Sequence, residues 1–141
     1  MLVSTKGRYA LRVMIDLAEH VGEGYLPLRD IARRQDISEK YLESILKVLV
    51  KAKLIEGLRG KGGGYRLTRD AADYTVGEVL RLTEGSLDPV SGLDDPAAFR
   101  LEESRCHEMW MGLAKLIGDY LDNYTVADLC VTSLAGNDYV I

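Results

Sequence analysis

Residues 38–65 read SEKYLESILKVLVKAKLIEGLRGKGGGY, and this stretch decides the fold. Its first part spaces apolar residues as one face of a helix does, and it keeps lysines and glutamates on the other faces. A short apolar run follows, and then a loop with Arg59, Lys61 and four glycines comes before Tyr65. A helix followed by a basic hairpin is typical of a winged helix-turn-helix. In that module the helix enters the major groove of DNA, and the hairpin contacts the adjacent phosphates or minor groove.

The residues before this stretch supply the other helices of such a module. Apolar residues at three- and four-residue intervals predict a first helix over residues 5–21. Pro27 opens a second helix that ends near residue 34, and Ser38 is interpreted as the N-cap of the third helix, residues 39–53. Two helices joined by a turn of about three residues form a helix-turn-helix. Residues 54–58 and 65–67 are short enough to be the strands of the hairpin.

The C-terminal half of the sequence predicts a dimerisation arm. A capping box at residues 75–78 starts a helix that ends near Thr83, and a loop rich in Gly, Pro, Ser and Asp follows. A long helix is expected over residues 97–123, with a short helix after it. Five residues of the long helix and its end are spaced 3, 4, 3 and 4 apart, as at a seam between two helices. We expect dimerisation through these residues: Trp110, Leu113, Ile117, Tyr120 and Tyr124.

These elements predict a mainly α fold with a small β-hairpin wing. Residues 1–84 are expected to form the winged helix-turn-helix domain, and residues 85–96 a linker. Residues 97–141 are expected to hold the long dimerisation helix and the short C-terminal helix.

Charge and composition favour a nucleic-acid partner and exclude several other classes. Residues 1–70 contain 14 Lys and Arg against 9 Asp and Glu, whereas residues 71–141 contain 4 against 13. A basic half suits a polyanion, and an acidic half avoids non-specific contact with it. The sequence has no run of about 18 apolar residues and no signal-peptide pattern, so we expect a cytoplasmic protein without a membrane span. Two cysteines exclude a disulfide framework.

Motifs for catalysis and for tightly bound groups are missing. The glycines of the hairpin do not form a phosphate-binding loop, because Ile55 and Tyr65 occupy positions where the two common motifs need glycine. The two histidines lack a credible serine or aspartate partner, so we do not expect an enzyme. Cys106-His107 offers two ligands where zinc needs four, and we expect no metal and no cofactor. A thiol at Cys106 activated by the imidazolium is the less favoured alternative.

Two features of the expected DNA-binding surface have alternative interpretations. Arg59 and Lys61 either enter a narrow minor groove of DNA or lie in solvent at the tip of the hairpin. The helix just before them favours contact with the minor groove. Glu43 either accepts a hydrogen bond from a cytosine amino group or pairs with Lys47 one turn later.

The chain resembles the Rrf-type winged-helix transcription regulators over essentially its whole length. Five stretches and Trp110 carry the resemblance: STKGRYALRVM at 4–14, DIARRQDISEKYLE at 30–43, LRGKGGGYRL at 58–67, TVGEVL at 75–80 and LDNYTVADL at 121–129. It implies a homodimeric transcription factor whose two winged helices bind double-stranded DNA at a palindrome. The family's DNA contacts fall on Ser38, Tyr41, Glu43, Lys47, Arg59 and Gly60–Gly63, with Lys6 and Arg8 near the DNA backbone. This range of the wing includes Lys61 and Gly62, and we add Lys40 and Ser44 from the third helix.

The resemblance also argues against an iron–sulfur cluster. Cluster-binding members of the family carry three cysteines, and the matching positions here look like Gly92, Ala98 and Ser104. His107 stands where the cluster histidine would be, and Cys106 lies two residues out of register. Since clusters need several thiolates, the chain is more similar to the cluster-free branch of cysteine metabolism repressors, whose sensing partner is cysteine synthase.

We therefore expect a repressor of cysteine or sulfur metabolism, and two alternatives stay open. One is a regulator of the same family that senses an iron–sulfur cluster, a metal or an oxidant through Cys106 and His107. The other belongs to a different class, a protein-interaction module that binds a metabolic enzyme such as cysteine synthase.

Overall fold

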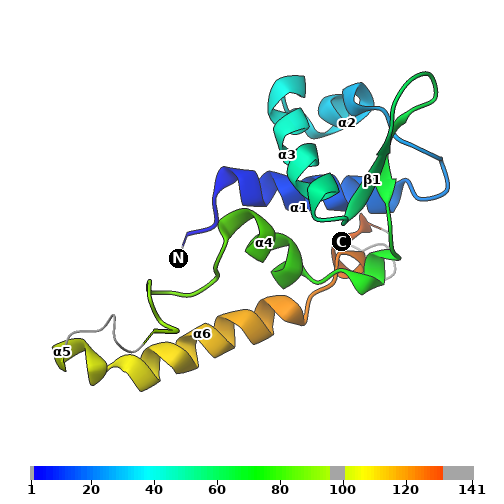
Figure 1. Cartoon of the computed structure of the whole chain (residues 1–141). Coiled ribbons are helices and arrows are strands. Elements are labelled where there is room, and N and C mark those ends of the chain that lie inside the picture. The colour runs from blue at the N-terminus through cyan, green and yellow to red at the C-terminus, as the bar shows by residue number, and fades with distance from the viewer. Residues whose placement is uncertain (1, 96–100, 132–141) are drawn as a thin grey trace.

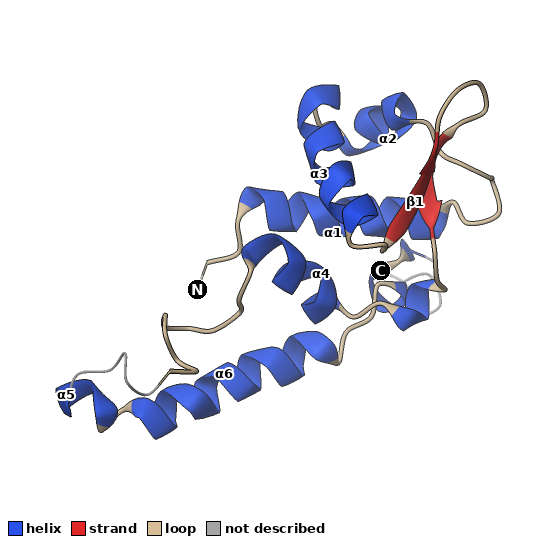
Figure 2. Cartoon of the chain, viewed as in Figure 1, coloured by secondary structure: helices blue, strands red, loops and turns tan. Residues whose placement is uncertain are grey.

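The computed structural model describes residues 2–95 and 101–131. The helix-turn-helix with its hairpin and the long C-terminal helix lie at opposite sides of the molecule, with the first helix, α1 (Thr5–Glu19), and the helix α4 (Val76–Glu84) between them (Figure 1). The N-terminal elements are α1 (Thr5–Glu19), α2 (Leu28–Gln35), α3 (Glu39–Lys51), β1 (Ile55–Leu58) and β2 (Gly64–Leu67). The later ones are a 3-10 turn (Ala71–Asp73), α4 (Val76–Glu84), α5 (Leu101–Ser104), α6 (His107–Asp122) and a second 3-10 turn (Ala127–Leu129). Mainly helical structure with one β-hairpin, drawn in red in Figure 2, confirms the predicted fold class.

Polar side chains cap the helices where the sequence predicted it. The Ser38 hydroxyl accepts a hydrogen bond from the Tyr41 amide at 3.2 Å, so it satisfies a free donor at the start of α3. Asp36 ends α2 in the left-handed conformation with φ of 54°, and Ile37 inserts into the core between the two helices. The helix-turn-helix is therefore fixed at both ends of its turn.

One hydrophobic core joins the three N-terminal helices to the hairpin and to the end of the described chain. Thirteen of its side chains are at most 1% exposed, and each such aliphatic residue contributes roughly 1.5–3 kcal/mol of burial free energy. They are Ala10, Val13, Met14, Leu17, Ile31, Leu42, Ile45, Leu46, Leu49, Ile55, Tyr74, Val79 and Val126. Val126 follows α6, so the chain returns to the N-terminal half after the predicted arm.

This return is held by main-chain pairing beside α4. The Val76 amide donates to the Tyr124 carbonyl at 2.8 Å, and the Val126 amide donates to the Tyr74 carbonyl at 3.0 Å. Thr125 and Asp128 then cap the last 3-10 turn reciprocally, with the geometry of a capping box. Cys130 is buried there.

The prediction of one continuous helix over residues 97–123 is wrong. Residues 97–100 lie outside the described part, and α5 and α6 are separate helices with a turn at Arg105 and Cys106. Ser104, Arg105 and Cys106 are all exposed, so burial of these three side chains does not stabilise a continuous helix. The first helix also ends two residues earlier than predicted, because His20 forms its C-cap and Val21 is exposed.

No helix within residues 2–95 and 101–131 has the length and apolar character that crossing a lipid bilayer requires.

Candidate nucleic-acid interface

The exposed face of α3 carries the polar residues that the sequence assigned to DNA. Ser38, Lys40, Glu43, Ser44 and Lys47 are all exposed. The Glu43 carboxylate lies 3.7 Å from the Lys47 ammonium, with both side chains more than half exposed. The ion-pair alternative for Glu43 is therefore present in the free protein. A pair so exposed is weak, and it leaves the carboxylate available to another partner.

Tyr41 is held in place by α1, a support that the sequence analysis missed. Its ring meets the ring of Tyr9 edge-on, with centroids 5.8 Å apart. The Arg12 guanidinium lies over Tyr9 at 4.8 Å and donates hydrogen bonds to the Gln35 side chain and carbonyl. A chain of contacts thus runs from the end of α2 through α1 to the start of α3. Only the three-residue spacing of Tyr9 and Arg12 in α1 hinted at it.

The tip of the wing depends on glycine at each sharp turn. Gly60 and Gly62 have φ of 90° and 77°, which side chains rarely adopt, and the Gly63 amide donates to the Gly60 carbonyl at 3.0 Å. A Cβ at Gly63 would collide with the Leu58 carbonyl. Arg59 and Lys61 project from this loop, exposed, and neither has an ion-pair partner within the described ranges.

The base of the wing is fastened by one buried hydroxyl. Tyr74 donates to the Leu54 carbonyl at 2.7 Å, and its oxygen accepts from the amides of Thr68 and Arg69 at 3.0 and 2.9 Å. Leu54 precedes β1 and Thr68 follows β2, so one side chain closes the hairpin. The Arg69 guanidinium covers the ring at 4.3 Å.

The wing is also tied to the residues just before α2. Tyr65 exchanges two main-chain hydrogen bonds with Leu26, at 2.8 and 2.9 Å, so β2 is paired on both edges at this point. The carbonyl of Leu26 lies so close to Gly64 that any Cβ there would collide with it. These contacts set the position of the hairpin relative to the helix-turn-helix.

Lys6 and Arg8 occupy the first turn of α1, which α4 anchors. Lys6 is half-buried and Arg8 is exposed. The Glu84 carboxylate accepts hydrogen bonds from the Ser4 hydroxyl at 2.6 Å and from the Ser4 amide at 3.0 Å. These bonds, that of the hydroxyl foremost, lower the pKa of Glu84. The end of α4 thereby fixes the direction of the segment that carries both cations.

Comparison with known proteins agrees with this geometry. The family model for Rrf2, described as an iron-dependent transcriptional regulator, matches residues 3–132. The chain belongs to the Rrf2 family of transcription regulators. It is 39% identical over 129 residues to the HTH-type transcriptional regulator CymR of Bacillus subtilis, covering 92% of this chain and 89% of that protein.

Solved structures of Rrf2 regulators have the same fold. The structure of CymR, the global cysteine regulator of B. subtilis, matches with a TM-score of 0.76 and 36% identity over 94% of this chain and 98% of that one. IscR of T. potens matches with a TM-score of 0.78 and 36% identity, over 100% and 93% of the two chains. The resemblance predicted from the sequence is confirmed. The relatives are named as transcription regulators, not as enzymes.

The residues at the three positions that match the cysteines of cluster-binding relatives do not fit an iron–sulfur cluster. Gly92 and Ser104 supply no thiolate, and Ala98 lies outside the described residues but is likewise not a cysteine. Cys106 is exposed and His107 is half-buried at the start of α6. Within the described ranges no three His, Cys, Asp or Glu side chains gather in a group suited to a metal ion.

The predicted dimerisation residues divide between two faces of α6. Leu113, Tyr120 and Tyr124 are exposed, and Trp110 is half-buried. Ile117 packs in part against the cluster of Val76, Leu80 and Leu87 within its own chain. Leu116, which the periodicity did not select, is 69% exposed instead. The 3-and-4 spacing assumes that all five residues face a single partner helix. It therefore could not distinguish residues that face α4 from residues on the exposed face of α6, which we call the open face.

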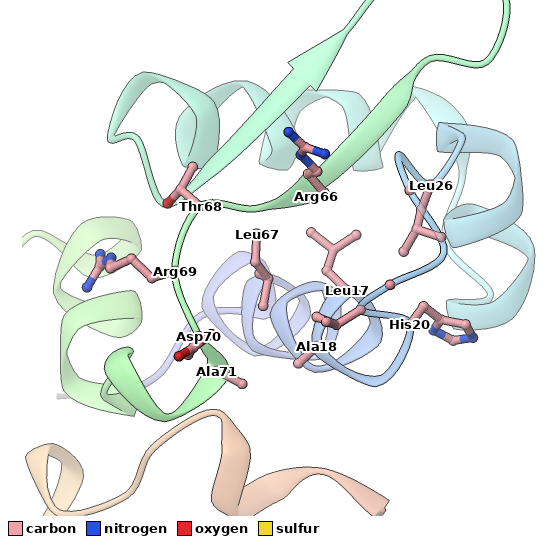
Figure 3. Close-up of a pocket in the computed structure, with 13 residues that line it drawn as sticks. Leu17, Ala18, His20, Leu26, Arg66, Leu67, Thr68, Arg69, Asp70 and Ala71 are labelled. Atoms are coloured by element: carbon pink, nitrogen blue, oxygen red, sulfur yellow. The ribbon is translucent and has the colours of Figure 1, made fainter.

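A hollow lies between the end of α1 and the segment after β2, away from α3 (Figure 3). It has a volume of about 650 Å³ and an apolar wall that includes Leu17, Leu26 and Leu67. The two arginines at its edge are already engaged, Arg66 with Glu56 at 2.5 Å and Arg69 with Glu78 at 2.8 Å. No predicted site residue lines it.

Proposed function

We propose that this Rrf2 protein is a cytoplasmic, homodimeric repressor that binds a palindromic operator. The observation that carries the proposal is the position of Arg59 and Lys61. These cations project without ion-pair partners, among the described residues, from the hairpin beside the exposed polar face of α3. A helix reads base edges in the major groove, and a cation on a wing suits the adjacent minor groove. Neutralising phosphates with such cations makes the affinity fall with salt.

The homodimer is supported by the open face of α6. Leu113, Leu116, Tyr120 and Tyr124 form an exposed apolar stripe, and Val3 borders it. Exposed apolar area of this kind along one side of a helix is typical of an interface. The helix that carries the stripe, α6, lies on the side of the molecule opposite the wing (Figure 1). A dimer formed there leaves both wings free for DNA.

Genes of cysteine or sulfur metabolism are the regulated set that we propose. Two facts support this choice: the likeness to the global cysteine regulator CymR, and the absence of cysteine at the cluster positions. By the same likeness, cysteine synthase is the proposed sensing partner. Addition of purified cysteine synthase to the protein–DNA complex is expected to change its operator affinity, and an unchanged affinity would remove it as a partner.

The first test is selection of the purified protein against a random DNA library at moderate salt. An enriched palindrome, with half-sites about one helical turn apart or a multiple of that, is the expected result. Its sequence is then searched for upstream of sulfur-metabolism genes. Failure to enrich any sequence, with and without cysteine synthase, would favour the interaction-module alternative.

A further inference from the structure

A groove separates α3 from the wing on the proposed DNA-binding side. Its volume is about 560 Å³. The residues that line it come from the second half of α3 and from both strands and the tip of the hairpin: Lys47, Val50, Lys51, Gly57, Leu58, Arg59, Gly60 and Tyr65. Of these, Val50, Lys51, Leu58 and Tyr65 have no role in the surface described so far.

Cations stand on both walls of the groove. Lys47 and Lys51 are one turn apart on α3, so both point to the same side of that helix. Arg59 faces them from the wing. Lys47 is paired with Glu43, whereas neither Lys51 nor Arg59 has an ion-pair partner among the residues that the structure describes. Opposed, unneutralised cations suit an anion that lies between them.

The floor between these walls is apolar and accessible. Val50 is 37% exposed and Leu58 is 50% exposed, although both are large aliphatic residues on a polar side of the protein. The Tyr65 ring lies across Gly57 on the paired strand, where a Cβ would come within 3.2 Å of it. A side chain at Gly57 would therefore press on the Tyr65 ring, which also lines the groove. An occupant must offer both negative charge and hydrocarbon surface.

A sugar–phosphate strand has this mixed character, and the docking geometry brings one to this place. When a helix occupies the major groove and a hairpin reaches the adjacent minor groove, one backbone strand of the duplex runs between them. We infer that this strand lies in the groove between α3 and the wing, with a phosphate bound by Lys51 and its deoxyribose against Val50 and Leu58. The inference rests on the proposed function and assigns Lys51 to the phosphate backbone, not to a base.

The test compares Lys51→Gln with Lys53→Gln on the selected operator and on unrelated DNA. Lys53 is exposed and close in sequence but does not line the groove. Lys51→Gln is expected to weaken binding to both DNAs by the same factor. It should also reduce the slope of log affinity against log salt by about 1. Lys53→Gln is expected to keep the wild-type affinity and slope. Equal melting temperatures of the three proteins will exclude a folding effect.

A phosphate scan locates the contact. Neutral methylphosphonates are placed one at a time along the operator, and binding of wild type and Lys51→Gln is measured. One phosphate between a half-site and its flanking minor groove should weaken wild-type binding when neutralised and leave Lys51→Gln unaffected. An unchanged salt slope for Lys51→Gln, or losses that add at every phosphate, would overturn the inference while the wild type still selects an operator. Loss of operator selection by the wild type itself would overturn the proposed function and the inference together.

Discussion

The carboxylate of Asp122, the last residue of α6, accepts two hydrogen bonds from the guanidinium of Arg81 on α4, at 2.7 and 2.9 Å. Asp122 also lies against Gly77 at the start of α4, where any Cβ would collide with its carboxylate. The pair therefore joins the proposed dimerisation helix to the helix that anchors α1. It is a direct side-chain link between α6 and α4.

The first prediction concerns the pH dependence of this pair. The hydrogen bonds from Arg81 lower the pKa of Asp122. A carboxyl whose folded pKa is lowered stabilises the fold above the unfolded pKa, about 4 for aspartate, and loses that contribution as pH falls through the folded pKa. Asp122→Asn should thus reduce the free energy of unfolding at neutral pH, by less than about 1 kcal/mol since both groups are partly exposed. Chemical denaturation across pH measures it.

The difference between wild type and Asp122→Asn should vanish in acid and shrink with added salt. A difference that persists in acid would show that the amide disturbs the packing against Gly77, and that the charge is not responsible.

Removal of Arg34 should leave a buried charge unpaired. Asp16 is 2% exposed, and Arg34 donates to its two oxygens at 2.9 and 2.7 Å while Gln35 donates at 2.8 Å. Breaking a fully buried pair from one side costs about 3–5 kcal/mol. Because the Arg34 side chain is 27% exposed and Gln35 still donates to Asp16, Arg34→Ala should lower the free energy of unfolding by somewhat less, about 2–3 kcal/mol. Urea denaturation provides the measurement.

The neighbouring Arg33 supplies the control for this prediction. Its side chain is 72% exposed and lies 3.7 Å from Asp30, so Arg33→Ala should change stability by less than about 0.5 kcal/mol. Adding Asp16→Asn to Arg34→Ala should recover part of the loss, because it removes the unpaired charge. Equal losses for Arg33→Ala and Arg34→Ala would contradict the assignment.

Tyr74→Phe tests the fastening of the wing. The ring stays in place, but the Leu54 carbonyl and the amides of Thr68 and Arg69 lose their common partner. Leaving buried polar groups unsatisfied costs roughly 1–3 kcal/mol each at most, and we expect a total loss near that range. Amide hydrogen exchange should rise at Thr68 and Arg69.

Tyr25→Phe is the control for this prediction, because the Tyr25 hydroxyl makes only a long contact of 3.4 Å with the partly exposed Glu56. Unchanged exchange in Tyr74→Phe would count against the fastening role.

Sequence reasoning identified the elements that depend on local patterns. The serine cap of α3, the glycines at the wing tip and the exposed polar face of α3 follow from residue type and spacing, and the structure has them. The contacts of Tyr9 with Tyr41, of Tyr74 with Leu54, and of Arg34 with Asp16 join residues distant in sequence, and spacing does not encode them. The break before α6 was missed for the same reason. Apolar periodicity reports which face of a helix is buried, but it does not report where packing stops.

Arg59→Ala tests the proposed role of the wing. Loss of a cation that enters the minor groove should weaken binding to the selected operator by roughly 1–3 kcal/mol, as measured by fluorescence anisotropy. Arg105→Ala removes an exposed arginine from the turn before α6, far from the wing in Figure 1, and should leave the operator affinity unchanged. Equal affinities of wild type and Arg59→Ala would contradict the proposal that Arg59 of the wing contacts DNA.

Leu116→Asp tests the proposed dimer interface on α6. Leu116 is 69% exposed in the single chain and lies beside Tyr120 and Val3 on the open face. Burial of an unpaired carboxylate at that position costs several kcal/mol in a dimer and nothing in a monomer, so the variant should sediment as a monomer at concentrations where the wild type is a dimer. Lys115→Gln is the control, because Lys115 is next to Leu116 in sequence and its exposed ion pair is with Asp119. This variant should remain a dimer. Since two linked half-sites bind more tightly than one, Leu116→Asp should also lose operator affinity while it keeps its fold. A monomeric wild type, or a dimeric Leu116→Asp, would exclude this face as the interface.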